Sequence, residues 1–180
     1  AVVETEGSRS LFENGVVVSS VPDPAAAEEA VHFALLEHSA PRKILLIGGG
    51  VNGSLAQALQ HPTLGRLDYV ELDPAIIAVG REYFAMTQPN LRAIADDGRA
   101  FLRRAGVYDV IAVDAYRQPY IPFHLTTVEF VRETRAHLTP RGVVAPRFVE
   151  LFAPAASMTS AAGRAECVVE MGNARGAKMR

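Results

Sequence analysis

Short apolar runs alternate with amphipathic stretches from residue 43 to residue 145. The run KILLIG is apolar at successive positions, which is typical of a parallel strand covered on both faces. Strands that alternate with helices in this way imply right-handed crossovers. The pattern therefore predicts an α/β fold with a doubly wound, Rossmann-type parallel sheet of strand order 3-2-1-4-5.

The expected strands of this sheet are, in chain order, residues 43–48, 67–73, 91–95, 107–114 and 142–145. Four helices are expected between these strands. The first follows the glycine-rich residues 48–53 and ends at Leu59, and the others cover residues 74–84, 97–104 and 126–138. Asp73 before Pro74 starts the second helix by capping. Thr126 and Glu129 have the spacing of a capping box at the start of the last one.

The first 21 residues carry a different pattern, with three short extended-type runs broken at Glu6-Gly7 and at Asn14-Gly15. Asn-Gly is the strongest short-range signal for a β-hairpin. We therefore expect a small β-hairpin or meander that lies outside the main sheet.

The pattern changes again at Pro22, because Asp23 can cap a helix with Pro24 at its first position. Pro41 ends that helix. We divide the chain into an N-terminal β-region (residues 1–21), a nucleoside-binding domain (residues 22–150) and a tail without an assigned role (residues 151–180).

The composition is that of a soluble globular protein, with 49% hydrophobic and 21% charged residues. A formal net charge of -2 gives no electrostatic reason to expect a nucleic acid or an anionic membrane as a partner. No apolar run reaches the roughly 18–20 residues that a membrane-spanning helix needs. Cys167 is the single cysteine and cannot form an internal disulfide, so we expect a reducing, cytoplasmic setting.

A glycine-rich turn follows the first strand of the predicted sheet. Its glycines Gly48, Gly50 and Gly53 match the pattern GxGxxG, and Gly49 lies among them. Such a turn lies where α/β sheets bind ligands, beyond the carboxyl ends of their strands. The turn predicts a nucleotide or nucleoside site, and the alternative is a purely structural turn.

Acidic residues follow the next two strands. Glu71 could accept two hydrogen bonds from ribose hydroxyls, unless it is a solvated acid at a strand end. Asp97, followed by Gly98, could accept a bond from the adenine amino group or cap the next helix, and these two roles can coexist. NAD would place its pyrophosphate on the glycine turn, whereas an adenosyl sulfonium nucleoside would place its amino-acid or aminopropyl end there. The acid at the end of the third strand favours the adenosyl sulfonium nucleoside.

Several segments together resemble spermidine synthase and its relatives, the polyamine aminopropyltransferases. These segments are ILLIGGGVNGSLAQALQHP, YVELDPAII, DDGRAFL, YDVIAVDAY and LTTVEF with LTPRGVVA. The resemblance implies a sheet of the class I methyltransferase kind behind a small N-terminal β-domain. It implies S-adenosylmethionine or its decarboxylated form as co-substrate, without a metal. Within the family, the sequence of these segments is most similar to synthase-like domains that are often fused to membrane segments.

By position, the resemblance makes Glu71 the ribose ligand, Asp97 the adenine-side acid and Asp114 the catalytic acid. Aminopropyl transfer is a displacement at the carbon beside a sulfonium, and the attacking amine is an ammonium at neutral pH. A carboxylate such as Asp114 could orient that amine and help to take its proton. The alternative for Asp114 is a role in capping the loop that follows it.

Residues 115–125 form a loop rich in proline and aromatic side chains. We assign substrate contacts there to Tyr116, Arg117 and Tyr120, although the aromatic rings could instead pack the loop onto the sheet. Phe123 is a further aromatic candidate, and His124 could be a base or a structural histidine.

The sequence departs from the family pattern where an amine would bind. Val51 stands at the acid of GGGDGG, and Arg117 at the second acid of the DSSD-type segment. Ala26 and Ala27 replace the first two residues of a Tyr-His-Glu motif, whereas Glu28 is kept. The nucleoside half of the site is therefore preserved and the diamine half is largely lost.

We expect a transferase that moves an aminopropyl or related group to an amine-type acceptor and acts poorly on putrescine. The alternatives are a methyltransferase that uses S-adenosylmethionine, a non-catalytic nucleoside-binding domain of a larger membrane protein and, least favoured, an NAD oxidoreductase. A homodimer is left open.

Overall fold

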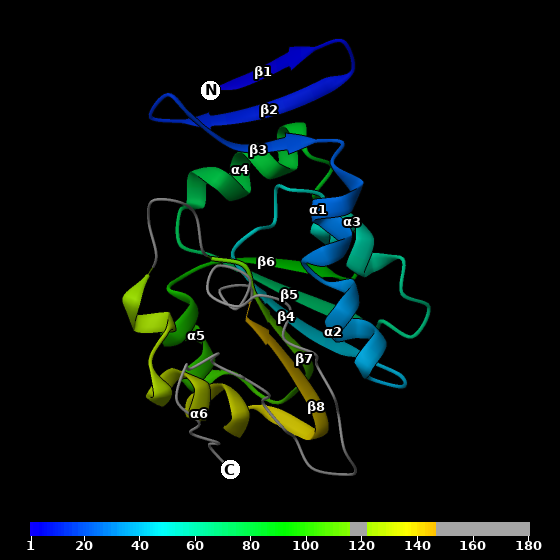
Figure 1. Ribbon diagram of the computed structural model, residues 1–180, viewed down its shortest axis with the longest axis vertical. Coiled ribbons are helices and arrows are strands. Elements are labelled where there is room, and N and C mark those ends of the chain that lie inside the picture. The colour runs from blue at the N-terminus through cyan, green and yellow to red at the C-terminus, as the bar shows by residue number, and fades with distance from the viewer. Residues whose placement is uncertain (116–121, 147–180) are drawn as a thin grey trace, which may run out of the picture.

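The computed structural model describes residues 1–115 and 122–146 (Figure 1). Within them, a five-stranded parallel sheet has the order β6-β5-β4-β7-β8. Its strands are β4 (Lys43–Ile47), β5 (Arg66–Glu71), β6 (Leu91–Ala95), β7 (Tyr108–Val113) and β8 (Leu138–Pro146). This order is the predicted 3-2-1-4-5 arrangement, so the α/β prediction is confirmed.

Helices cover both faces of the sheet. They are α1 (Pro24–Glu29), α2 (His32–Glu37), α3 (Ser54–Leu59), α4 (Pro74–Tyr83), α5 (Gly98–Arg104) and α6 (Val128–Ala136), with a short 3₁₀ turn, η1 (Phe123–Leu125). Figure 1 shows α1, α2 and α3 on one side of the sheet and α5 and α6 on the other. This is the two-sided cover that a doubly wound sheet requires.

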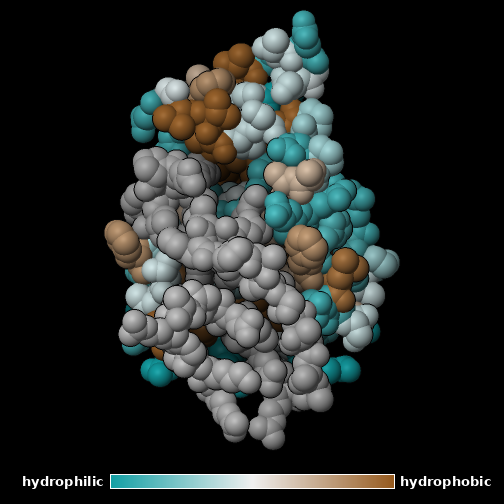
Figure 2. All heavy atoms as spheres, viewed as in Figure 1, coloured by the Kyte–Doolittle hydropathy of each residue, from teal (hydrophilic) through white to brown (hydrophobic). Residues whose placement is uncertain are grey.

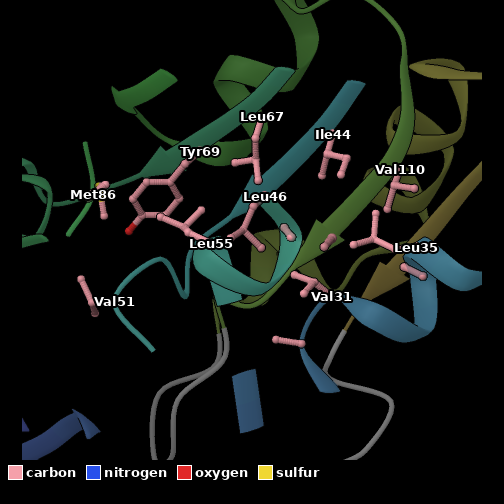
Figure 3. Close-up of a cluster of buried hydrophobic side chains, with 14 of the residues drawn as sticks. Val31, Leu35, Ile44, Leu46, Val51, Leu55, Leu67, Tyr69, Met86 and Val110 are labelled. Atoms are coloured by element: carbon pink, nitrogen blue, oxygen red, sulfur yellow. The ribbon is translucent and has the colours of Figure 1, made fainter. Parts of the chain in front are cut away.

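The core has two parts because successive strand residues point to opposite faces. On one face, Leu46 and Tyr69 pack against Leu35 of α2 and Leu55 of α3 (Figure 3). On the other face, strand residues that include Leu45, Val70 and Ile111 pack against Phe101 of α5 and Phe130 of α6. Burial on both faces explains the apolar runs without alternation.

The N-terminal strands β1 (Val2–Thr5), β2 (Ser8–Glu13) and β3 (Val16–Val21) form a separate antiparallel sheet, as predicted. The residues of both turns have positive φ: 49° at Glu6, 81° at Gly7, 51° at Asn14 and 81° at Gly15. Two successive positive φ angles are the requirement of the tight hairpin turn that Asn-Gly favours. Figure 2 shows hydrophobic residues gathered at this end of the molecule, and exposed apolar side chains of this sheet include Val16 and Val17.

The helix predicted between Pro24 and Pro41 is wrong in one respect, because it is divided into α1 and α2. Asp23 caps α1 as expected, by accepting a bond from Ala26 N–H. Val31 then leaves the helical region, with φ −134° and ψ −35°, and its side chain is 2% exposed in the core. Tertiary burial of this β-branched residue accompanies the break.

The start of α6 is also corrected. Thr127, not Thr126, accepts the capping bond from Phe130 N–H. The hydroxyl of Thr126 instead donates to the Phe123 carbonyl and so belongs to the preceding turn. The helix ends at Ala136, and Leu138 opens β8.

The two sheets agree with a boundary near residue 21, but the division into three regions stays a prediction, and residues 151–180 lie outside the described part. Within residues 1–115 and 122–146, no helix combines the length and the apolar character that a bilayer crossing requires.

Candidate functional site

Backbone hydrogen bonds place the predicted site residues at one edge of the sheet. Gly48 N–H donates to Val70 O (2.9 Å), and Asp114 N–H donates to Ile47 O (2.8 Å). Asp96 N–H donates to Glu71 O (2.9 Å). The glycine turn, Glu71, the Asp96-Asp97 pair and Asp114 therefore follow the carboxyl ends of four neighbouring strands.

The glycine turn is shaped by both backbone angles and lack of space. Gly48 and Gly49 have φ of 75° and 70°. A Cβ on Gly49 would lie 2.2 Å from Asp114 Oδ2, and one on Gly48 would lie 2.8 Å from Ala115 Cα. Side chains at these positions are excluded because the end of β7 lies directly against the turn.

Asp114 itself is 6% exposed and is held by a residue that the sequence analysis missed. Asn52 Nδ2–H donates to Asp114 Oδ2 at 2.8 Å. Ser54 N–H donates to Asn52 Oδ1 at 3.0 Å, which fixes the amide with its nitrogen toward Asp114. The signal in the sequence is an Asn in a glycine-rich turn, where its side chain can bond the backbone N–H two residues on.

Val51 is buried in the apolar core, with 2% of its surface exposed. It belongs to the cluster of Leu55 and Met86 (Figure 3). Its carbonyl accepts a bond from the buried Ser19 hydroxyl of β3 at 2.9 Å. The sequence predicted only that the charge of the family's acid is missing at this position. The structure shows in addition that the side chain of Val51 is part of the apolar core.

Glu71 is partly buried at the end of β5, and two donors orient it. Tyr69 O–H donates to Glu71 Oε2 at 2.7 Å, and Asp73 N–H donates to Oε1 at 3.3 Å. The side chain of Asp73 accepts from Ala75 N–H, so its predicted capping role is confirmed. A Cβ on Gly50 would lie 2.3 Å from Tyr69 Cζ, so the ring of Tyr69 fills the space beside this glycine.

Asp97 caps α5, as one of the two interpretations expected. Its Oδ1 accepts from Ala100 N–H at 2.8 Å, and its Oδ2 lies 3.1 Å from His124 Nε2. A Cβ on Gly98 would lie 2.4 Å from Ile47 Cγ2, so close packing accounts for this glycine. A contact of Asp97 with adenine stays a prediction.

Helix α5 is also bonded to the 3₁₀ turn η1 and to helix α6. Arg99 donates to the His124 carbonyl at 2.9 Å and to both carboxylate oxygens of Glu133 at 2.7 and 2.9 Å. Hydrogen bonds from Arg99 and Arg103 hold the pKa of Glu133 down at about 2. His124 is thus tied to α5 through both its ring and its carbonyl.

The remaining predicted residues divide into two groups. Tyr116, Arg117 and Tyr120 lie outside the described residues. On α1, Ala27 is buried, and a Cβ on Gly53 would lie 3.1 Å from its Cβ, whereas Glu28 is exposed. Of the three positions aligned with the Tyr-His-Glu motif, it is therefore Ala27 that lies beside the glycine turn.

The part of the chain that the structure describes holds no group of three His, Cys, Asp or Glu side chains that could bind a metal.

Comparisons with a family model, with curated proteins and with solved structures all find spermidine synthase and its relatives. The polyamine aminopropyltransferase of Leptospira biflexa is 31% identical over 153 residues, which are 80% of this chain and 54% of that protein. Putrescine N-methyltransferase 3 of Nicotiana tabacum is 36% identical over 95 residues, which are 49% of this chain and 25% of that protein. The crystal structure of a spermidine synthase in complex with the transition state analogue AdoDATO has a TM-score of 0.70 at 23% identity.

That crystal structure matches 81% of this chain and 56% of its own, and at this identity it shows the shared fold. The chain spans about half the length of the aminopropyltransferase, or less for other relatives. The family model of the spermine/spermidine synthase domain matches residues 24–159, most of the chain. On this match, the chain belongs to the spermine/spermidine synthase domain family.

Proposed function

We propose that this protein is a spermidine-synthase-like transferase that binds an adenosyl sulfonium nucleoside at the carboxyl edge of its sheet. The nucleoside is S-adenosylmethionine or its decarboxylated form. The observation that supports this most is the backbone ladder that brings Gly48, Glu71, Asp96 and Asp114 to neighbouring strand ends. Ligands of doubly wound sheets bind at such an edge.

The residues at this edge match the parts of an adenosyl nucleoside. Glu71 carries carboxylate oxygens that suit the ribose hydroxyls. Asp97 Oδ2, which lies beside His124, suits the adenine amino group once the helix cap has taken Oδ1. The turn at Gly48–Gly50 would face the sulfonium end. No phosphate is needed, so NAD is the poorer match.

Transfer at this site is a substitution in which atoms and electrons balance. The lone pair of the acceptor amine forms a bond to the carbon beside the sulfonium. The carbon–sulfur bond breaks, and its electron pair returns to sulfur, which becomes a neutral thioether. The amine loses one proton, and Asp114 is the described carboxylate beside the glycine turn that can orient the amine and help to accept that proton.

The acceptor is expected to differ from putrescine. Val51 adds no charge and points into the core, and Asn52 contributes a neutral amide beside Asp114. A diamine brings two positive charges, and a buried ammonium without a partner costs several kcal/mol. We therefore propose an acceptor with a single ammonium group near Asp114.

The experiment uses the nucleoside product, because it reports transfer whichever amine accepts. The protein is incubated with decarboxylated S-adenosylmethionine and a panel of mono- and diamines, and methylthioadenosine is measured by mass spectrometry. We expect methylthioadenosine with a monoamine, spermidine from putrescine far below a turnover of about 1 per second, and loss of product in Asp114→Asn. Absence of methylthioadenosine with every amine contradicts aminopropyl transfer, and rapid spermidine formation contradicts the acceptor assignment.

A methyltransferase is the second candidate, supported by the apolar Val51 where an acid would meet the amine of the donor. It predicts S-adenosylhomocysteine as the product when S-adenosylmethionine is supplied in the same assay. The nucleoside product thus decides between the two reactions.

We keep a cytoplasmic location as an expectation, based on the single cysteine.

A further inference from the structure

Tyr69 is a fully buried tyrosine whose ring and hydroxyl touch different parts of the candidate site. Its side chain is 0% exposed within the core (Figure 3). The ring lies against Gly50 of the glycine turn, where any Cβ would overlap it. The hydroxyl donates to Glu71 Oε2 at 2.7 Å. One rigid side chain therefore joins the glycine turn to the predicted ribose acid.

The hydrogen bonds that Glu71 already accepts leave some of its carboxylate lone pairs for a ligand. An ionised carboxylate offers about four lone-pair sites, two on each oxygen. Within the described part of the chain, Tyr69 takes one site on Oε2 and the longer bond from Asp73 N–H takes one on Oε1. One site then remains on each oxygen, which is the arrangement that two adjacent hydroxyl groups require.

We propose that Tyr69 is a positioning residue that aims Glu71 at the 2′- and 3′-hydroxyls of the nucleoside and thereby makes the site selective for ribose. The inference rests on the proposed function, because it assumes that an adenosyl nucleoside binds at this edge. Tyr69 acts through Glu71 and does not itself touch the ligand. A site built for two hydroxyls rejects an analogue that lacks one, because a carboxylate lone pair then loses its partner.

Tyr108 provides a matched control on the opposite face of the sheet. It is 1% exposed and donates its hydroxyl to Asp68 Oδ2 at 2.8 Å. Asp68 is also bonded by Arg66 at 2.8 and 3.1 Å, so it keeps a partner when the tyrosine hydroxyl is removed. Tyr108→Phe therefore removes the same group from an equally buried tyrosine away from the site.

The test is calorimetric titration of the whole chain with 5′-methylthioadenosine and with its 2′,3′-dideoxy counterpart, which lacks both hydroxyls that Glu71 would bind. We expect Tyr69→Phe to weaken methylthioadenosine binding about tenfold and to change the affinity for the dideoxy compound by less than about twofold. The preference for ribose then shrinks. Tyr108→Phe should leave both affinities within about twofold, and thermal melts check that both variants fold.

A double-mutant cycle with Glu71→Ala separates a positioning role from a structural one. If Tyr69 acts through Glu71, Tyr69→Phe has no further effect once Glu71 is gone. Equal weakening of both compounds, or an undiminished effect in the Glu71→Ala background, would overturn the inference. So would an unchanged ribose preference in Tyr69→Phe. A parent protein that binds neither compound contradicts the proposed function itself, and the inference falls with it.

Discussion

Two carboxylates on the same strand, Asp68 and Glu71, differ in what surrounds them. Asp68 lies toward the amino end of β5, is 1% exposed, and receives two bonds from Arg66 and one from Tyr108. Glu71 lies at the carboxyl end and is only partly buried. The donors that reach it within the described residues, Tyr69 O–H and Asp73 N–H, are both neutral.

Asp109 repeats the first arrangement in the second residue of β7. It accepts bonds from the N–H groups of Arg42 and Lys43 and from the Thr139 hydroxyl. Burial acts to raise the pKa of Asp109, but these hydrogen bonds outweigh it and lower the pKa. Within the described residues, Asp68 and Asp109 each accept three hydrogen bonds from the fold itself, whereas Glu71 accepts two and keeps one lone pair on each oxygen for a ligand.

The largest effect is expected where an acid is placed in the core beside the carboxyl edge. Val51→Asp would bury a carboxylate in an apolar cluster, and we expect a loss of about 3–4 kcal/mol in the free energy of unfolding. Val107→Asp is the matched control, since Val107 is 51% exposed. Urea denaturation measures both. If Val51→Asp is as stable as its control, the position is not part of the core.

Asp68→Ala should lower stability by about 2–3 kcal/mol, because it strips a buried tyrosine hydroxyl and a half-exposed Arg66 of their partner. We expect methylthioadenosine affinity to change by less than about twofold. Urea denaturation and calorimetry measure the two quantities. Strong loss of nucleoside binding in a folded Asp68→Ala protein would remove the distinction between the two carboxylates.

A smaller effect is expected from Asn52→Asp. The variant keeps an oxygen for Ser54 N–H but sets a second carboxylate 2.8 Å from Asp114 Oδ2. We expect methylthioadenosine production from the decarboxylated donor to fall about tenfold or more, because like charges repel at that distance. Asn90→Asp, the same change at another partly buried asparagine, should leave the rate unchanged. Equal rates in the two variants would show that the Asn52 contact does not matter for transfer.

The smallest effect concerns acid pH. The pKa of Glu133 is about 2 in the folded chain, below the ordinary value of 4.5, because Arg99 and Arg103 bond to it. A lowered pKa stabilises the fold above the ordinary value, and that contribution is lost as the pH falls from about 4.5 toward 2. In urea denaturation, Glu133→Gln should flatten this decline slightly, and less so at high salt. A decline that is the same in parent and variant would contradict the contribution of Glu133.

The strand order was predicted from the alternation of strands and helices together with the usual connections of a doubly wound sheet. The strands themselves and the N-terminal meander follow from local patterns such as KILLIG and Asn14-Gly15. The glycine turn and the strand-end acids Glu71 and Asp97 could be placed for the same reason. The break at Val31 could not, since it depends on burial against the sheet. The contacts of Tyr69 with Glu71 and of Asn52 with Asp114 were also out of reach. They depend on side-chain orientation and, for Asn52, on the approach of strands distant in sequence.

The central claim is that the carboxyl edge of the sheet binds an adenosyl nucleoside through Glu71. The most direct measurement is calorimetric titration of the parent and of Glu71→Ala with 5′-methylthioadenosine and with NAD. We expect the parent to bind methylthioadenosine and to bind NAD poorly. Glu71→Ala should bind methylthioadenosine at least tenfold more weakly, because two hydrogen bonds to a charged acceptor are worth roughly 1.5–3 kcal/mol each. An unchanged affinity in Glu71→Ala, or tighter binding of NAD than of methylthioadenosine, would contradict the account.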